Sequence, residues 1–264
     1  MKFTSAILTA ALFLSSSTGS SAQESKVVRS GANTEERELR GKRGGRSERC
    51  GRGEKMALKV INLTRAQPFA RDVFVMVHND EIPPLFEYGG TATEQLKALA
   101  ENGDAGPLVA LYGPMDGVRA VRVEPAIPPG ATAYIDIDDV RRRYPYLTMA
   151  AMFVHSNDGF AAINGERVQV GDVLELNGID AGTELNSENC VDIPGPACNN
   201  LDGDGNVIDN PNMSAGQDVP DHIRIHSGFF GEGADGPRLT AARYTWLNPM
   251  LRVEVVCVDE DMLV

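Results

Sequence analysis

The strongest constraint on the fold is an apolar run at residues 147–154, LTMAAMFV, which ends in a polar corner at residues 155–159. A buried helix segment would show the same lack of polar residues. The length of the run and the turn residues that bound it favour a β-strand buried in the core. We therefore take this strand as the element around which the rest of the chain is organised.

Other short segments rich in β-forming residues lie on both sides of this strand, separated by proline and glycine turns. The segments that we predict as strands are 57–64, 72–79, 118–124, 132–138, 222–227, 240–246 and 251–258. Between the central strand and the last three lies a long polar loop at about residues 186–220. The pattern predicts a mainly β protein with an antiparallel β-sandwich fold.

One helix is predicted at about residues 91–102. Thr91 and Glu94 have the spacing of a capping box, and Gly103 is placed to end the helix. Its inward stripe is formed by small and aliphatic side chains. They are Ala92, Leu96, Leu99 and Ala100.

Residues 1–22 have the pattern of a secretory signal peptide. Lys2 gives the charged start, residues 6–14 the apolar run, and residues 20–22 a cleavage site of small residues. The apolar run is too short to span a membrane, and an ordinary buried helix is the alternative. We expect an exported, extracellular protein without a membrane span.

Residues 23–55 form an arginine-rich segment with few apolar residues, which we expect to be a disordered linker. It can be a processing site, through the basic residues 40–43, or an arm that binds polyanions, or a solvated tail. The folded domain is expected at residues 56–264. The linker has ten Lys or Arg against six Asp or Glu, and Lys2 adds one more positive charge, so a total net charge of −12 leaves residues 56–264 at −12 − 5 = −17. Such an acidic body disfavours nucleic acid and anionic membranes as partners and suits cations.

Three acids are the strongest candidate site. Asp180 and Glu184 flank Gly182 in the motif DAGTE, and Asp158 lies far enough upstream for a strand or two to return it to their side. Three carboxylates on adjacent loop ends repel one another unless they are protonated or bridged by a cation. Calcium, which binds six to eight oxygens, is the predicted ligand. Solvated loop acids are the alternative.

The segments VINLTRAQPF, LTMAAMFVHSNDGF and DAGTELNSE together resemble the spondin amino-terminal domain of secreted matrix proteins. The resemblance covers roughly residues 58–256. It implies a β-sandwich similar to C2 domains that holds one Ca²⁺ through Asp158, Asp180 and Glu184. This chain has Glu184 where family members usually have Asp, and Gly159 and Phe160 follow Asp158 where they usually have Trp.

The resemblance also implies a function. It indicates a secreted module that acts by binding in cell-surface or matrix adhesion, with an extracellular protein or glycan as partner and no enzymatic activity. The alternatives are a secreted hydrolase that uses Asp158 with a histidine in a calcium-supported cleft, or a structural component of a wall or matrix.

Three further motifs carry weaker predictions. Asp202, Asp204 and Asn206 alternate like the first ligands of a calcium loop, but the glycine and glutamate of an EF-hand are missing, so a mobile acidic turn is favoured. The glycine-rich segment at 231–236 is expected to be a loop because no helix pattern follows it. Three histidines, His155, His222 and His226, are expected to be structural, with the latter two on one face of a strand.

The four cysteines of an exported chain predict two disulfides. Cys190 and Cys198 enclose a short loop and form the expected local pair, which leaves Cys50 to pair with Cys257. A free Cys50 in the linker is the alternative.

Two glycosylation sequons begin at Asn62 and Asn212. Asn212 lies in a predicted loop. Asn62 lies in a predicted strand, so it can be used only if its side chain points outward.

Overall fold

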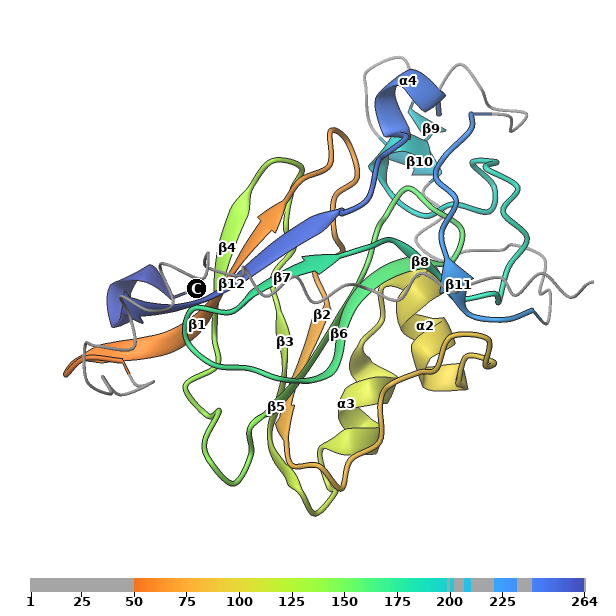
Figure 1. Cartoon of the computed structure of the whole chain (residues 1–264). Coiled ribbons are helices and arrows are strands. Elements are labelled where there is room, and N and C mark those ends of the chain that lie inside the picture. The colour runs from red at the N-terminus through yellow and green to blue at the C-terminus, as the bar shows by residue number, and fades with distance from the viewer. Residues whose placement is uncertain (1–49, 199, 202–206, 210–220, 232–238, 264) are drawn as a thin grey trace, which may run out of the picture.

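The computed structural model describes residues 50–198, 200–201, 207–209, 221–231 and 239–263 (Figure 1). In chain order the strands are β1 (Glu54–Asn62), β2 (Val73–His78), β3 (Val118–Glu124), β4 (Thr132–Asp136), β5 (Tyr146–Met152), β6 (Gly159–Arg167), β7 (Val173–Leu176), β8 (Ile179–Asp180), β9 (Asn200–Leu201), β10 (Val207–Asp209), β11 (Arg224–Ile225) and β12 (Leu251–Asp259). The α-helices are α2 (Glu94–Asn102), α3 (Gly106–Tyr112) and α4 (Ala241–Tyr244), with short 3-10 turns at Pro196–Cys198 and Glu260–Met262.

The strands form two antiparallel sheets that pack face to face, with a separate hairpin of β9 and β10. One sheet has the order β4-β1-β12-β7, and the other has the order β11-β8-β6-β5-β2-β3. The predicted class, mainly β with an antiparallel sandwich, is confirmed.

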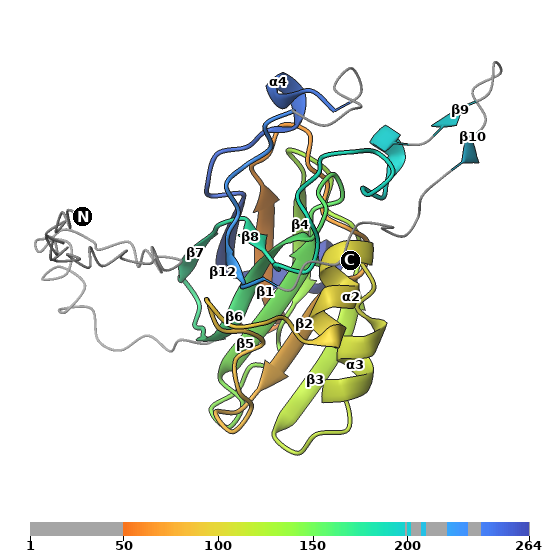
Figure 2. The ribbon, with the colours of Figure 1, turned by 90° about the vertical axis from the view of Figure 1, so that its right-hand side faces the viewer.

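The inner strands of the six-stranded sheet are buried on both faces. In β2 the residues Val73, Val75 and Val77 belong to the core between the sheets, while Phe74 and Met76 belong to a second apolar cluster. That second cluster lies under α2 and α3, which cover the outer face of this sheet (Figure 2). The same arrangement explains the unbroken apolar run of β5, because a strand with no solvated face has no need of alternating polar residues.

Helix α2 begins and ends on capping residues. The N-cap is Thr93, whose hydroxyl accepts a hydrogen bond from the Leu96 amide at 3.2 Å, and the C-cap is Gly103 in the left-handed conformation. The stop at Gly103 is confirmed, but the predicted capping box at Thr91 is wrong. Leu96 and Leu99 are fully buried, as the predicted stripe requires.

Six of the eight predicted strand segments contain a strand of four or more residues, and two predictions change. Residues 240–246 form helix α4, not a strand, since Ala241, Ala242 and Arg243 are good helix formers behind an extended Thr240. The segment 222–227 pairs over only two residues, in β11. Strands β6, β7 and β8, helix α3 and the hairpin inside the long polar loop were not predicted from the sequence.

Both disulfides are present. Cys190 is bonded to Cys198, and Cys50 is bonded to Cys257, so the alternative of a free Cys50 is wrong. Strand β1 begins at Glu54, and the folded domain therefore starts slightly before residue 56. The expected signal peptide and most of the expected linker lie outside the described residues.

In the described part of the chain, no helix has the length and apolar character of a membrane span.

Candidate functional site

Strand pairing brings two of the three predicted acids together. Asp158 immediately precedes β6 and Asp180 ends β8, and the two strands pair so that Gly159 lies opposite Asp180. The Ala181 amide also donates to the Asp158 carbonyl at 3.1 Å. Both acids are buried, with at most 2% of either residue exposed. A pair of carboxylates with this burial is a functional candidate, because charge inside a protein is costly unless something offsets it.

The two oxygens of Asp158 have different surroundings. Oδ2 accepts hydrogen bonds from the Thr183 amide at 2.7 Å, the Glu184 amide at 3.2 Å and the Thr183 hydroxyl at 3.3 Å. Oδ1 is buried and has no hydrogen-bond donor among the described residues. A buried acceptor in this state carries a free-energy penalty of about 1–3 kcal/mol.

Asp180 is fully engaged. Its Oδ1 accepts from the Gly182 amide at 2.8 Å, and its Oδ2 accepts from Asn186 Nδ2 at 2.6 Å. The same Oδ2 forms an ion pair with Arg224 Nη2 at 3.0 Å. Arg224 thus supplies a positive charge to the buried acids from the neighbouring strand β11.

The local backbone explains why the DAGTE motif has a glycine at its centre. Gly182 has a φ of 66°, in the left-handed region, and a Cβ at this position would lie 2.7 Å from the His222 carbonyl oxygen. Only glycine fits both conditions. The tight turn that results is what returns the Thr183 and Glu184 amides to Asp158.

Glu184 is buried beside this turn, with 3% of the residue exposed, and its amide donates to Asp158. Within the described residues, no group of three or more acidic, histidine or cysteine side chains is close enough to hold a metal ion. Asp202, Asp204 and Asn206, the second predicted ion loop, lie outside the described residues.

Burial is the main cause that raises the pKa of Asp158, to about 6, and the charge of Asp180 raises it further. The hydrogen bonds from Thr183 and Glu184 act in the opposite direction. A cation near Asp158 would remove this penalty, and the bare Oδ1 offers it a ligand. One oxygen of Asp158 is therefore available to a cation, while both oxygens of Asp180 are already engaged by Gly182, Asn186 and Arg224.

His226 lies near the two acids, but the contacts of its ring are with aromatic side chains. Its ring lies 4.8 Å from the Trp246 ring and 5.8 Å from the Phe153 ring, measured between centroids, and its Nδ1 accepts from the Gly228 amide at 3.1 Å. Burial lowers the pKa of His226 to about 4, an effect that Arg224 adds to and Asp180 opposes. His226 is therefore a neutral, packed histidine. His222 is exposed while His226 is buried, so the prediction that they share a face is wrong.

One buried acid could not be identified from the sequence. The carboxylate of Glu188 accepts from the Phe230 amide at 2.6 Å and from the Gly231 amide at 2.5 Å, and so fixes the loop after DAGTE to the chain that follows β11. Glu188 also has a φ of 54°. A glutamate with left-handed backbone in a polar loop carries no motif that would have identified it.

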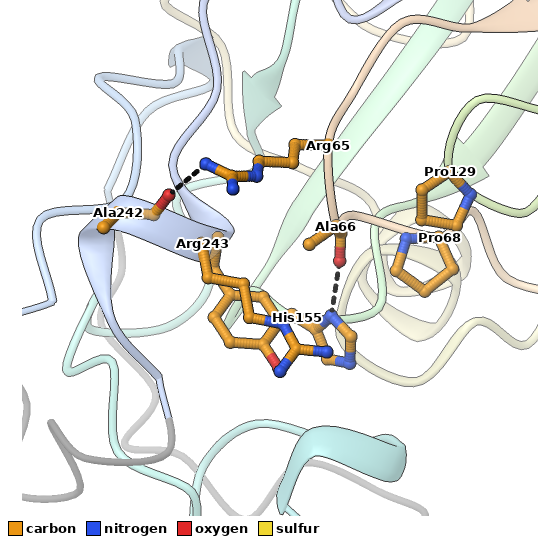
Figure 3. A pocket seen from close by; sticks show the side chains of 8 residues that line it. Arg65, Ala66, Pro68, Pro129, His155, Ala242 and Arg243 are labelled. Carbon is orange, nitrogen blue, oxygen red and sulfur yellow. Dashed lines mark hydrogen bonds between the residues drawn. The ribbon is translucent and has the colours of Figure 1, made fainter.

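A pocket of about 550 Å³ lies at the end of the sandwich where α4 is found (Figure 3). Four chain segments line it: the one after β1, the turn between β3 and β4 with Pro129, the β5–β6 corner with His155, and α4. The lining residues are Arg65, Ala66, Pro68, Pro129, His155, Ala242, Arg243 and Tyr244.

The buried side chain of Gln67 holds these segments together. Its Nε2 donates to the carbonyls of His155 at 3.0 Å and Tyr244 at 3.1 Å, and its Oε1 accepts from the His155 amide at 3.2 Å. The pocket is therefore formed in advance of any ligand. No sequence motif marks it, because its residues come from positions far apart in the chain.

The sequon at Asn62 points inward. The Asn62 side chain is 1% exposed, and its Nδ2 donates to the carbonyls of Gln67 at 2.9 Å and Ile127 at 3.0 Å. It cannot carry a glycan in the folded domain. Asn212 lies outside the described residues.

Comparison of the chain with protein-family models found no matching family, and comparison with curated proteins found no match.

Proposed function

We propose that this chain is a secreted, calcium-binding β-sandwich module, similar to the spondin amino-terminal domain and to C2 domains, that acts by binding a cell-surface or matrix partner. The observation that carries the calcium part is the buried pair Asp158 and Asp180, in which Asp158 Oδ1 has no donor among the described residues. Asp158 would bind the ion through Oδ1, and Asp180 and Glu184 are the two further candidate ligands; Asp180 would have to exchange its contact with Arg224 for the ion. When bound, calcium would neutralise the acids and stabilise the fold.

Secretion is supported by the pattern of residues 1–22 and by the two disulfides, since disulfides persist in oxidising compartments. The acidic composition is compatible with an extracellular environment rich in calcium. The partner belongs to the class of extracellular proteins or glycans.

Binding is favoured over hydrolysis by the composition of the pocket. His155 lines it, but none of the described residues around it is a serine, threonine, cysteine, aspartate or glutamate. A histidine without a nucleophile or a carboxylate beside it lacks the partners of hydrolytic catalysis.

The test is the melting temperature of the purified chain in calcium and in EDTA. Because calcium binds the folded chain alone, it should stabilise it by about 2.7 kcal/mol at a hundredfold excess over Kd, which corresponds to several degrees. Asp180→Asn should weaken the calcium dependence, while Asp116→Asn, at an exposed position, should leave it unchanged. An identical melting curve in calcium and in EDTA would contradict the proposal.

A further inference from the structure

The pocket beside α4 has a positive charge that the chain does not neutralise. Arg65 and Arg243 are both exposed at its edge, and neither forms an ion pair with an acid of the described residues. Arg65 Nη1 donates instead to the Ala242 carbonyl at 3.1 Å, and the Arg243 guanidinium lies 5.3 Å from the centre of the Tyr244 ring (Figure 3). The chain as a whole is acidic, with a net charge of −12, so this positive charge is local to the pocket. They indicate an anionic ligand, because guanidinium groups bind oxyanions bidentately.

The pocket also contains a hydrogen-bond acceptor without a partner. His155 Nδ1 lies 3.0 Å from the Ala66 carbonyl oxygen, so Nδ1 carries the proton and Nε2 has a free lone pair. Only 5% of His155 is exposed, and its Nε2 has no partner among the described residues. The ring lies 4.9 Å from the ring of Tyr244, the residue that follows Arg243. The nitrogen lies just behind the pocket surface, so a ligand hydroxyl reaches it only after a small side-chain shift; a hydrogen bond donated there would satisfy it.

The size and the lining set further limits on the ligand. A volume of about 550 Å³ is within the range of about 300–1,000 Å³ that is usual for small-molecule sites. Pro68, Pro129 and Ala66 provide apolar walls against which the carbon face of a ring can pack. The acidic chain repels a doubly charged anion more strongly than a singly charged one, which favours a carboxylate over a phosphate.

We propose that this pocket binds a hydroxylated monocarboxylate of the sugar-acid class, with Arg65 and Arg243 on the carboxylate and His155 Nε2 on a hydroxyl group. This inference rests on the proposed role in binding, for which it names a ligand class, and it does not depend on calcium, since none of the three acids lines the pocket. Terminal or exposed uronic acid residues of a glycan would present this chemistry.

The experiment is a titration of the purified chain with D-glucuronate, followed by calorimetry, in calcium and again in EDTA. Wild-type protein should bind glucuronate in both buffers, and glucose, which lacks the carboxylate, should bind at least about tenfold more weakly. Cyclohexanecarboxylate, which lacks the hydroxyls, should also bind more weakly than glucuronate. The assignment would be overturned if glucose 6-phosphate bound more tightly than glucuronate. It would also be overturned if glucose or cyclohexanecarboxylate bound as tightly as glucuronate.

Two variants and one control connect the binding to the pocket. Arg65→Gln and Arg243→Gln should each raise the Kd for glucuronate about tenfold or more, because each removes a charge-assisted hydrogen bond. Arg142→Gln removes the same charge at an exposed position outside the pocket and should change the Kd by less than about twofold. An unchanged Kd in both pocket variants overturns the proposal. If glucuronate fails to bind while calcium still raises the melting temperature, the sugar-acid site is wrong and the calcium module stands. If glucuronate binds while calcium leaves the melting temperature unchanged, the sugar-acid site stands and the calcium module is wrong.

Discussion

Arg224 connects the stability of the fold to the charge of the buried acids. Its Nη2 pairs with Asp180 at 3.0 Å, while about two-fifths of its side chain stays in contact with solvent. Arg224→Gln should lower the free energy of unfolding in EDTA by about 1–3 kcal/mol, because it leaves a buried carboxylate without its cation. Denaturant titration in EDTA measures this loss.

Calcium should partly restore the Arg224→Gln variant, and the stabilisation by calcium should be larger in the variant than in the wild type. The control is Arg252→Gln, which breaks an exposed pair with Glu254 and should cost less than about 1 kcal/mol. Equal losses in the two variants would show that Arg224 has no special role at the acids.

The turn of the DAGTE motif should be sensitive to substitution at Gly182. Gly182→Ala should destabilise the fold by about 2–4 kcal/mol, since the alanine would combine a positive φ with a Cβ 2.7 Å from the His222 carbonyl oxygen. Gly171→Ala is the matched control, because Gly171 has a φ of 94° and a Cβ added there would meet no atom within 4 Å, so this variant has the backbone strain alone. Chemical denaturation of both variants gives the difference that belongs to the close approach.

At this scale the sequence predicts the acids better than their contacts. Asp158 and Asp180 could be placed together from the motif and the intervening strands. The contribution of Arg224 could not be predicted, because it depends on the two-residue pairing of β11 with β8. The pocket depends on Gln67, an ordinary residue whose role arises only from three segments meeting around it.

At the scale of elements, burial on both faces explains which predictions succeed. Strands β2 and β5 are continuous apolar runs and were found, as was β12, whose inward residues alternate. Strand β6 begins at a glycine, is rich in alanine and ends in charged residues, so its composition resembles a loop or a helix as much as a strand. Helix α4 has a β-branched and aromatic flank that imitates a strand, and its four residues are too few for a helical period to show.

The two disulfides should contribute unequally to stability. Cys50–Cys257 encloses a sequence separation of 207 residues, whereas Cys190–Cys198 encloses 8. In the chain-entropy model the longer loop restricts the unfolded chain more, by about 5 kcal/mol against about 2–3 kcal/mol. The double variant Cys50→Ser/Cys257→Ser should therefore melt at a lower temperature than Cys190→Ser/Cys198→Ser in calorimetry. The opposite order would show that strain or residual structure dominates.

At the scale of the whole molecule, buried histidines should make the fold sensitive to acid. Burial lowers the pKa of His78, His155 and His226, the last to about 4. Below about pH 6.5 the unfolded chain therefore binds more protons than the folded chain, and stability is lost as the pH falls toward 4. Asp158 acts in the opposite direction, since its raised pKa favours the folded state as the pH falls from about 6.

Burial also raises the pKa of Glu124, so three histidines oppose two acids, and the melting temperature in EDTA should decrease from about pH 7 to about pH 4.5. His226→Phe keeps a ring between Phe153 and Trp246 and removes one titrating group, so the melting temperature of this variant should depend less steeply on pH. His222→Gln, at an exposed position, should leave the slope unchanged. A slope that is the same in all three proteins would contradict this account.

The pairing of β1 with β12 has a consequence for how such a domain can be mounted. Glu54 lies opposite Asp259 and Asn62 lies opposite Leu251, so the described chain enters and leaves side by side at one end of the four-stranded sheet, locked by Cys50–Cys257. Arg65 follows the far end of β1, and Tyr244 precedes the far end of β12. A fusion partner or surface tether joined at either end of the described chain would thus lie at the end of the domain opposite the pocket. A force applied to both ends would act on the Cys50–Cys257 disulfide before it acts on the strands of the sandwich.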